Sequence, residues 1–315
     1  MRLLVYLPLL LSALAAVTAR PLAARMEPRQ ATWLLTAATV VLAGCSMVAL
    51  ALIAASAAAR IPLLATIGHY SQPVVRRSDP TPVVAGAAAA ILLTAAGLAV
   101  TITVRRRARA LAESYRRAAR MEDDGAIVVV PGPAIEAYAL PGWPGRIVVS
   151  GRLLSELDDG GRAALLAHEE AHLACRHHLF ATIAHLAAAA NPLLLPLAHA
   201  VDYTVERWAD ERAASATGDR RLVATTIAQV ALLATPPRRQ AVTATLGIVR
   251  PTARRISVAW AGPVPRRVAA LLGPPPRPRR PLLAASAVLL TLAGASALEA
   301  ARDLHSLLEL ASNIH

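Results

Sequence analysis

Four stretches of the chain are apolar for long enough to cross a membrane as helices. Residues 3–19, 31–59, 82–104 and 282–298 contain no charged side chain, and each is close to or above the roughly 20 residues that a span needs. Over the whole chain, 56% of residues are hydrophobic and the mean hydropathy is +0.47. This pattern predicts an α-helical integral membrane protein with four spans.

The first apolar run has a second interpretation. Arg2, the apolar core behind it and the small residues AVTA before Arg20 are also typical of a secretory signal peptide. At this point the sequence leaves both possibilities open.

A fifth apolar stretch, residues 179–199, is interrupted by His185, by Asn191-Pro192 and by Pro196. Proline and asparagine at such positions favour a chain reversal over a continuous helix. The stretch therefore predicts a buried or membrane-grazing hairpin.

The arginines predict which parts lie in the cytosol. All 33 basic residues are arginine, and dense clusters follow the third run (105–109) and precede the last (277–280). Positive charge beside spans stays on the cytoplasmic side. We therefore expect, in the plasma membrane, a three-span region (1–104), a cytosolic domain (105–281), a fourth span (282–300) and a short external tail (301–315). The loop 60–81 is expected to be external.

The same arginines suggest a partner. They flank the spans and lack interleaved aromatic side chains, so anionic lipid headgroups of the bilayer are favoured over nucleic acid, for which no direct contact is expected. Cys45 and Cys175 cannot form a disulfide framework and are interpreted as reduced thiols.

The expected cytosolic domain mixes strands and helices. Residues 126–132 and 145–151 are β-branched runs bounded by Gly and Pro, with a turn at 142–145. After Asp158 and Asp159, either of which can cap a helix, the pattern becomes helical. The Pro- and Arg-rich segment 235–280 gives no clear prediction.

Residues 165–178, LLAHEEAHLACRHH, concentrate side chains that bind metal ions. Histidines four apart on a helix share one face, so His168 and His172 can hold a single ion between their imidazoles. Glu169 is rotated about 100° from His168 and can reach a water on that ion without binding the ion itself. This H-E-x-x-H pattern predicts a zinc site, against the alternative of a helix with buried or solvated histidines.

Zinc needs a third protein ligand, and residues 201–214 offer one. Asp202, Glu206 and Asp210 recur every four residues on one helix face. A reversal at Asn191-Pro192 leaves helical arms of about 28 Å and 21 Å, which would return Glu206 near the histidines. Glu211 is the competitor, and a solvated acidic face is the alternative interpretation of the stripe.

These motifs together resemble the membrane-bound gluzincin metallopeptidases. H-E-x-x-H is followed by an E-x-x-A-D pattern at residues 206–210. The order of the spans resembles that of the BlaR/MecR-type antirepressor peptidases, and the stretch before the zinc helix is also similar to HtpX-like peptidases. The resemblance implies a four-span membrane protein with a cytosolic α+β gluzincin-type zinc metallopeptidase domain. It also favours a retained first span over a cleaved signal.

The resemblance further implies roles for individual residues and a Zn²⁺ cofactor. The metal ligands would be His168, His172 and Glu206, and the catalytic base would be Glu169. Asp210 would orient a histidine ligand, and His177 matches a further recurring position.

Two further expectations concern the substrate, a protein or peptide. Strand 145–150 is expected to offer an edge for an extended substrate. Tyr203 or a nearby arginine is expected to stabilise the oxyanion.

The chain departs from the antibiotic sensors among the BlaR/MecR-type proteins, since only 15 residues follow residue 300, too few for a folded external sensor. The favoured function is cleavage of a cytosolic regulator in signal transduction, possibly a winged-helix repressor protein. The alternatives are HtpX-like quality control of membrane proteins and a non-catalytic membrane receptor or scaffold.

Overall fold

A computed structural model describes residues 3–60, 83–120, 125–234, 263–277 and 280–312. The chain divides into two compact units. Unit 1 comprises residues 1–107, 180–202 and 278–315, and unit 2 comprises residues 108–179 and 203–277. Nearly all of the predicted external loop 60–81 lies outside the described residues.

The four apolar runs are helical. The helices are α1 (Leu7–Arg25, preceded by the short 3-10 helix η1, Leu3–Tyr6), α2 (Pro28–Ala58), α5 (Val83–Arg120) and α13 (Arg280–Ser312). Within the described part of the chain, α1, α2 and α5 are long and apolar enough to cross a membrane. These three helices indicate a membrane protein, and the fourth span stays a prediction.

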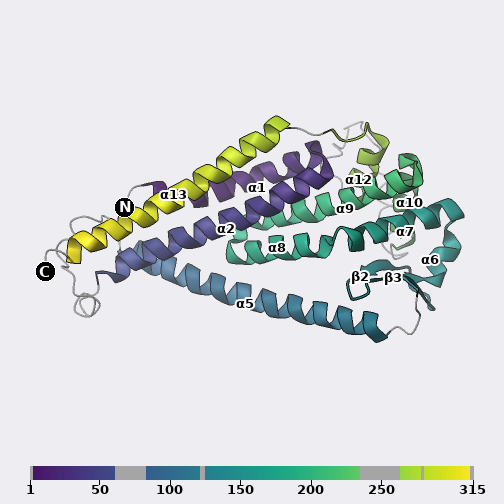
Figure 1. Ribbon diagram of the computed structural model, residues 1–315, viewed down its shortest axis with the longest axis horizontal. Helices are drawn as coiled ribbons and strands as arrows, with labels where there is room; N and C mark the ends of the chain where they lie inside the picture. Colours follow the sequence, from purple (N-terminus) through teal and green to yellow (C-terminus); the bar gives the residue numbers. More distant parts are fainter. Residues whose placement is uncertain (1–2, 61–82, 121–124, 235–262, 278–279, 313–315) are drawn as a thin grey trace, which may run out of the picture. The chain divides into compact units, whose positions relative to one another are not determined.

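In unit 1, α1, α2 and α13 pack side by side (Figure 1). The first connection is only two residues long, and Glu27 in it caps α2 by accepting hydrogen bonds from the backbone N–H groups of Arg29 and Gln30. Many of the side chains buried between these helices are small, such as Ala49 on α2 and Ala300 on α13. Small side chains let helix backbones approach closely where lipid gives no hydrophobic driving force.

The stretch 179–199 reverses at Asn191. Helix α8 (His177–Ala190) ends there, and the short 3-10 helix η2 (Pro192–Leu194) leads into α9 (Leu195–Thr217). The Asn191 side-chain amide donates hydrogen bonds to the hydroxyls of Ser12 on α1 (3.1 Å) and Ser46 on α2 (3.0 Å), and its oxygen accepts from Leu193 N–H. Because buried polar groups need such partners, this contact anchors the reversal on α1.

Unit 2 contains a three-stranded sheet of order β1-β3-β2, formed by β1 (Ile127–Val130), β2 (Ala137–Leu140) and β3 (Arg146–Ser150). β1 runs parallel to β3, and β2 runs antiparallel to it. The predicted strands at 126–132 and 145–151 are present. β2 was not predicted, because AYAL is short and has no β-branched residue.

The expectation that strand 145–150 provides a free edge is wrong. β3 is the central strand and is buried at every position, so both of its edges are already paired. β2 is an edge strand of this sheet and packs against helix α7. An extended substrate would therefore meet β2.

Two helices pack on this sheet, α6 (Gly151–Glu156) and α7 (Asp159–Ala174), and two more follow in the same unit, α10 (Arg220–Leu233) and α12 (Pro263–Leu272). Asp158 caps α7, as the sequence predicted, by accepting a 2.7 Å hydrogen bond from Gly161 N–H. Val149, Leu153 and Leu165 form a buried cluster between the sheet and the helices. Helix α7 also contacts α10, which packs on α12. The metal-binding motif thus lies on a helix that is fixed on two sides.

Candidate metal centre

Helix α7 places the two predicted histidine ligands on one face, because they are four residues apart. Their Nε2 atoms lie 3.1 Å from one another. Two ligands of a tetrahedral zinc ion at about 2.0–2.1 Å would lie about 3.4 Å apart. The spacing of His168 and His172 therefore fits a shared ion.

Helix α9 brings Glu206 to the same point. Its Oε2 atom lies 3.6 Å from His168 Nε2, and its Oε1 atom lies 3.6 Å from His172 Nε2. The three ligand atoms lie within 4.8 Å of one another, close to the dimensions of one face of a tetrahedron. Two imidazoles and a carboxylate are a common donor set for catalytic zinc. The residues thus fit the predicted ion, with a fourth position left for water.

The Nδ1 atoms of both histidines have hydrogen-bond partners, so both Nε2 lone pairs are free to bind one ion at the shared position. His168 Nδ1 lies 3.0 Å from Asp210 Oδ1, so the ring proton belongs on Nδ1. His172 Nδ1 lies 3.1 Å from Nδ1 of the fully buried His177, which can accept the His172 Nδ1–H. The ring of His177 also packs on Trp208, 4.7 Å between centroids. Asp210 and His177 therefore both hold the tautomer that metal binding requires.

The two histidine ligands have opposite pKa shifts when no ion is bound. Burial disfavours the charged form of His168, but hydrogen bonds to Asp210 and Glu206 outweigh it and raise its pKa to about 9. Burial and the positive charge of His168 lower the pKa of His172 to about 4. Because the two Nε2 atoms lie 3.1 Å apart, the pair carries one proton more than two neutral rings, and a metal ion would displace that proton.

Glu169 lies next to the ligands but is not one of them. It is 9% exposed, and burial raises its pKa above the ordinary glutamate value, although the nearby His168 and the Ala139 backbone N–H of β2 both oppose this rise. A carboxyl group with a raised pKa, beside a position where water could bind a metal, is suited to taking up and releasing a proton.

Arg267 is a site residue that the sequence did not reveal. It projects from α12 and its guanidinium makes a bidentate contact with Asp210, at 2.8 Å and 2.6 Å. A third contact, 2.8 Å long, joins it to Glu206 Oε2. Arg267 lies in the Pro- and Arg-rich segment 235–280, which gave no clear prediction. The sequence does not show which of the 33 arginines pairs with which carboxylate.

Other residues considered from the sequence lie elsewhere. Asp202 pairs with His185 at 2.9 Å, Glu211 pairs with Arg220 at 3.0 Å, and Glu170 is exposed. Tyr203 lies under the guanidinium of Arg266, 4.0 Å from its ring centroid. The acidic stripe on α9 therefore contributes Glu206 and Asp210 to the cluster, but not Asp202.

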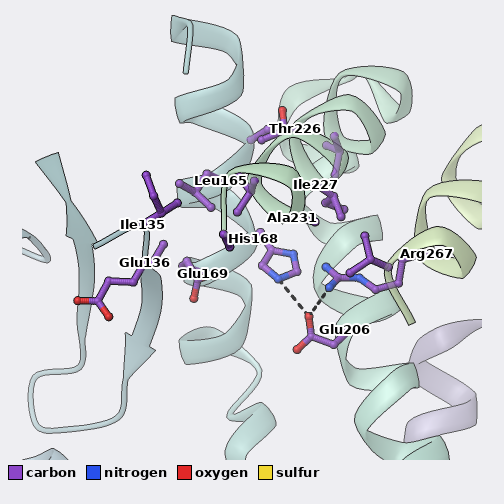
Figure 2. A pocket seen from close by; sticks show the side chains of 16 residues that line it. Ile135, Glu136, Leu165, His168, Glu169, Glu206, Thr226, Ile227, Ala231 and Arg267 are labelled. Carbon is purple, nitrogen blue, oxygen red and sulfur yellow. Dashed lines mark ion pairs between the residues drawn. The ribbon is translucent and has the colours of Figure 1, made fainter. Parts of the chain in front are cut away.

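A cavity of about 390 Å³ opens beside the cluster. Figure 2 shows His168, Glu169, Glu206 and Arg267 at one end of it, with apolar side chains of α7 and α10 at the other. A substrate group in this cavity would touch the metal ligands and the buried carboxyl group at once.

Residues 101–190 match the model of peptidase family M48. No curated protein and no solved structure matches the chain. The matched segment includes the sheet, α7 and all of α8, and thus His168, Glu169 and His172. Peptidases of this family depend on zinc, so the match and the geometry of the cluster both support a membrane metallopeptidase.

Replacing Arg267 by methionine is expected to destabilise the zinc-free protein by about 3 kcal/mol, because it removes the guanidinium that contacts the buried carboxylate of Asp210 and the partly exposed carboxylate of Glu206. Zinc should restore part of this loss, since the ion supplies positive charge at the same place. Unfolding measured in detergent with and without zinc tests this. The control is Arg266→Met, which should lower the free energy of unfolding by about 1 kcal/mol or less, the value of a cation–π contact. Equal losses of stability in both variants would contradict the role assigned to Arg267.

Proposed function

We propose that this protein is a membrane-bound zinc endopeptidase that cleaves a cytosolic regulator. The observation that carries the proposal is the His168–His172–Glu206 cluster next to the buried carboxyl group of Glu169. The match to peptidase family M48 over residues 101–190 supports the same chemistry.

In this proposal Glu169 is the proton carrier. When bound, zinc supplies a Lewis acid that polarises the scissile carbonyl and lowers the pKa of the attacking water. The carboxylate of Glu169 accepts the proton of that water and later delivers it to the nitrogen of the leaving amine. Its raised pKa suits both halves of this exchange, because the group must hold the proton between the two steps.

Strand β2 is suited to holding an extended substrate beside this carboxyl group. Ser150 N–H donates to Glu136 C=O, so in the alternating ladder of an antiparallel pair the backbone groups of Ala137 and Ala139 point away from β3. The Ala139 N–H bonds to Glu169. Ala137 lines the cavity, and we propose that its outward groups pair with the substrate backbone.

Arg267 is the better of the two expected groups for stabilising the oxyanion. Its guanidinium lines the cavity and lies 2.8 Å from Glu206. Tyr203 is buried under Arg266 instead. A fixed positive charge at this place would favour the negative charge that develops on the scissile carbonyl oxygen.

The location of the catalytic residues is proposed from charge. Arg105, Arg106, Arg107 and Arg109 are exposed on α5 directly after its apolar part. The positive-inside rule would place this end of α5, and the catalytic unit that follows, in the cytosol at the plasma membrane. The same arginines would bind anionic lipid headgroups.

Two biological roles are consistent with this peptidase chemistry. The order of the apolar helices supports a BlaR/MecR-type peptidase that acts on a regulator, such as a winged-helix repressor. The match to peptidase family M48 is equally consistent with HtpX-like quality control of membrane proteins. The third hypothesis, a non-catalytic receptor or scaffold, is disfavoured by the assembled ligand cluster and its buried carboxyl group.

The test compares newly formed protein N-termini in cells that express the native chain or its Glu169→Gln variant. A regulatory peptidase should produce one or a few new N-termini, in cytosolic proteins, only with the native chain. Many new N-termini in membrane proteins would favour quality control. Identical N-termini in both cell lines would contradict the peptidase proposal.

A further inference from the structure

The cavity beside the metal cluster is polar at one end and apolar at the other. The apolar lining comes from Ile135 just before β2, from Leu165 on α7 and from Val223, Ile227, Val230 and Ala231 on α10. Figure 2 shows Leu165, Ile227 and Ala231 in this part of the cavity, together with Thr226. The cavity's volume of about 390 Å³ is near the lower limit of the roughly 300–1,000 Å³ of ligand pockets. That space suits one large side chain with its adjoining backbone.

Helix α10 makes this wall rigid. Its lining residues recur at helical spacing, so they form a continuous stripe on one face. The helix begins at a firm cap, because the Asp219 side chain accepts hydrogen bonds from the backbone N–H groups of Arg221 and Leu222. It packs on both α7 and α12. The apolar wall is therefore held at a fixed distance from His168.

The charges at the polar end of the cavity disfavour the binding of an acidic substrate side chain. Glu169 and Glu206 line the polar end of the cavity. Among the described residues that line the cavity, the guanidinium is that of Arg267, which is already paired with Asp210 and Glu206. An acidic side chain would lose its hydration in this cavity without gaining a free cation.

We propose that the apolar end selects a large aliphatic side chain, such as leucine, isoleucine or methionine, on the substrate residue next to the scissile bond. This proposal rests on the proposed peptidase function. A substrate paired with Ala137 of β2 would direct alternate side chains to the same side, and Ala137 itself lines the cavity. The scissile bond would lie at the polar end, and the neighbouring side chain would fill the apolar end.

The size of the preference follows from apolar burial. Burying a whole leucine side chain in an apolar pocket changes kcat/KM by about 10- to 160-fold. We expect leucine to exceed glycine by about 100-fold, and aspartate to be the poorest residue at this position.

The probe is a set of decapeptides of alanine and glycine in which one central position carries leucine, alanine, glycine or aspartate. The zinc-loaded full chain in detergent is incubated with each peptide, and mass spectrometry maps and times the cleavage. Cleavage directly beside leucine, at the rates given above, is expected. Equal cleavage of all four peptides would overturn the proposal and leave the peptidase function intact.

Two variants locate the preference in the cavity. Ala231→Phe fills the apolar end and should lower cleavage beside leucine at least about tenfold, a larger loss than for the glycine peptide. Ile227→Ala enlarges the cavity and should improve cleavage beside phenylalanine. The control is Leu232→Phe, which introduces the same side chain at the next residue, where the native leucine is 66% exposed.

Binding separates this proposal from the peptidase function itself. In the zinc-loaded Glu169→Gln variant, the same peptides should bind in the order leucine, alanine, glycine, aspartate, as measured by calorimetry. If the native chain cleaves no peptide but this order of binding holds, the result supports the specificity pocket and contradicts the peptidase proposal. If Ala231→Phe and Leu232→Phe leave the leucine preference equally strong, the cavity is not the specificity pocket.

Discussion

Replacing Glu169 by glutamine is expected to abolish peptide hydrolysis and to leave the metal site filled. Glutamine has nearly the same shape, so the ligand cluster of His168, His172 and Glu206 should keep about one zinc ion per chain. An amide cannot accept the proton of the attacking water. The loss of this proton transfer should lower kcat by about 100- to 10,000-fold. Metal content and peptide cleavage are measured on the same preparation in detergent.

The matched control is Glu170→Gln, the same change on the next residue of α7. Glu170 is exposed, whereas Glu169 is buried and accepts the Ala139 backbone N–H. The control should change neither zinc content nor cleavage. Full activity of Glu169→Gln would refute the assignment of the catalytic base, and with it the proposed enzyme mechanism.

Removing any one of the three ligands is expected to empty the metal site. His168→Ala, His172→Ala and Glu206→Ala each take away one of three donor atoms that lie within 4.8 Å of one another. Zinc affinity should fall by more than the roughly 10- to 100-fold that is typical of losing a supporting residue behind a ligand. Cleavage should disappear along with the metal. Zinc titration against a competing chelator gives the affinity of each variant.

Two controls separate ligand loss from general damage. His178→Ala removes a histidine that neighbours His177 but is not part of the cluster. Glu211→Gln removes the carboxylate that competed with Glu206 in the sequence argument and that pairs with Arg220. Both should bind zinc like the native chain. Zinc loss in Glu211→Gln, together with zinc retention in Glu206→Ala, would show that α9 is placed in the wrong register.

The helix with the histidine pair could be predicted because its geometry is local. Residues four apart share a helix face wherever that helix lies in the fold, so His168, Glu169 and His172 required only an α-helix. The Asp158 cap depended on local sequence in the same way. The apolar helices followed from composition and length alone.

The third carboxylate was only partly determined by sequence. The stripe on α9 offered three acidic residues at equivalent spacing, and spacing cannot choose among them. The fold separates them: Asp202 pairs with His185, whereas Glu206 and Asp210 both reach His168. The choice depends on where α9 begins after the reversal at Asn191, which itself rests on hydrogen bonds to α1 and α2.

Strand order and Arg267 could not be predicted at all. The alternation of apolar residues predicts that 146–150 is a strand, but which strand becomes the edge depends on pairing between distant segments. Arg267 meets Asp210 57 residues away along the chain, and a guanidinium carries no sequence signal of its partner.

By itself, the sequence determined the apolar helices and the metal-binding face of α7, because periodicity and residue spacing act within a single element. Only the tertiary structure decided which carboxylate completes the cluster, which arginine neutralises it, and which strand and cavity face the substrate. Those features are contacts between segments far apart in the chain. They depend on the packing of α9, α10 and α12 around α7 and the sheet, which no local pattern encodes.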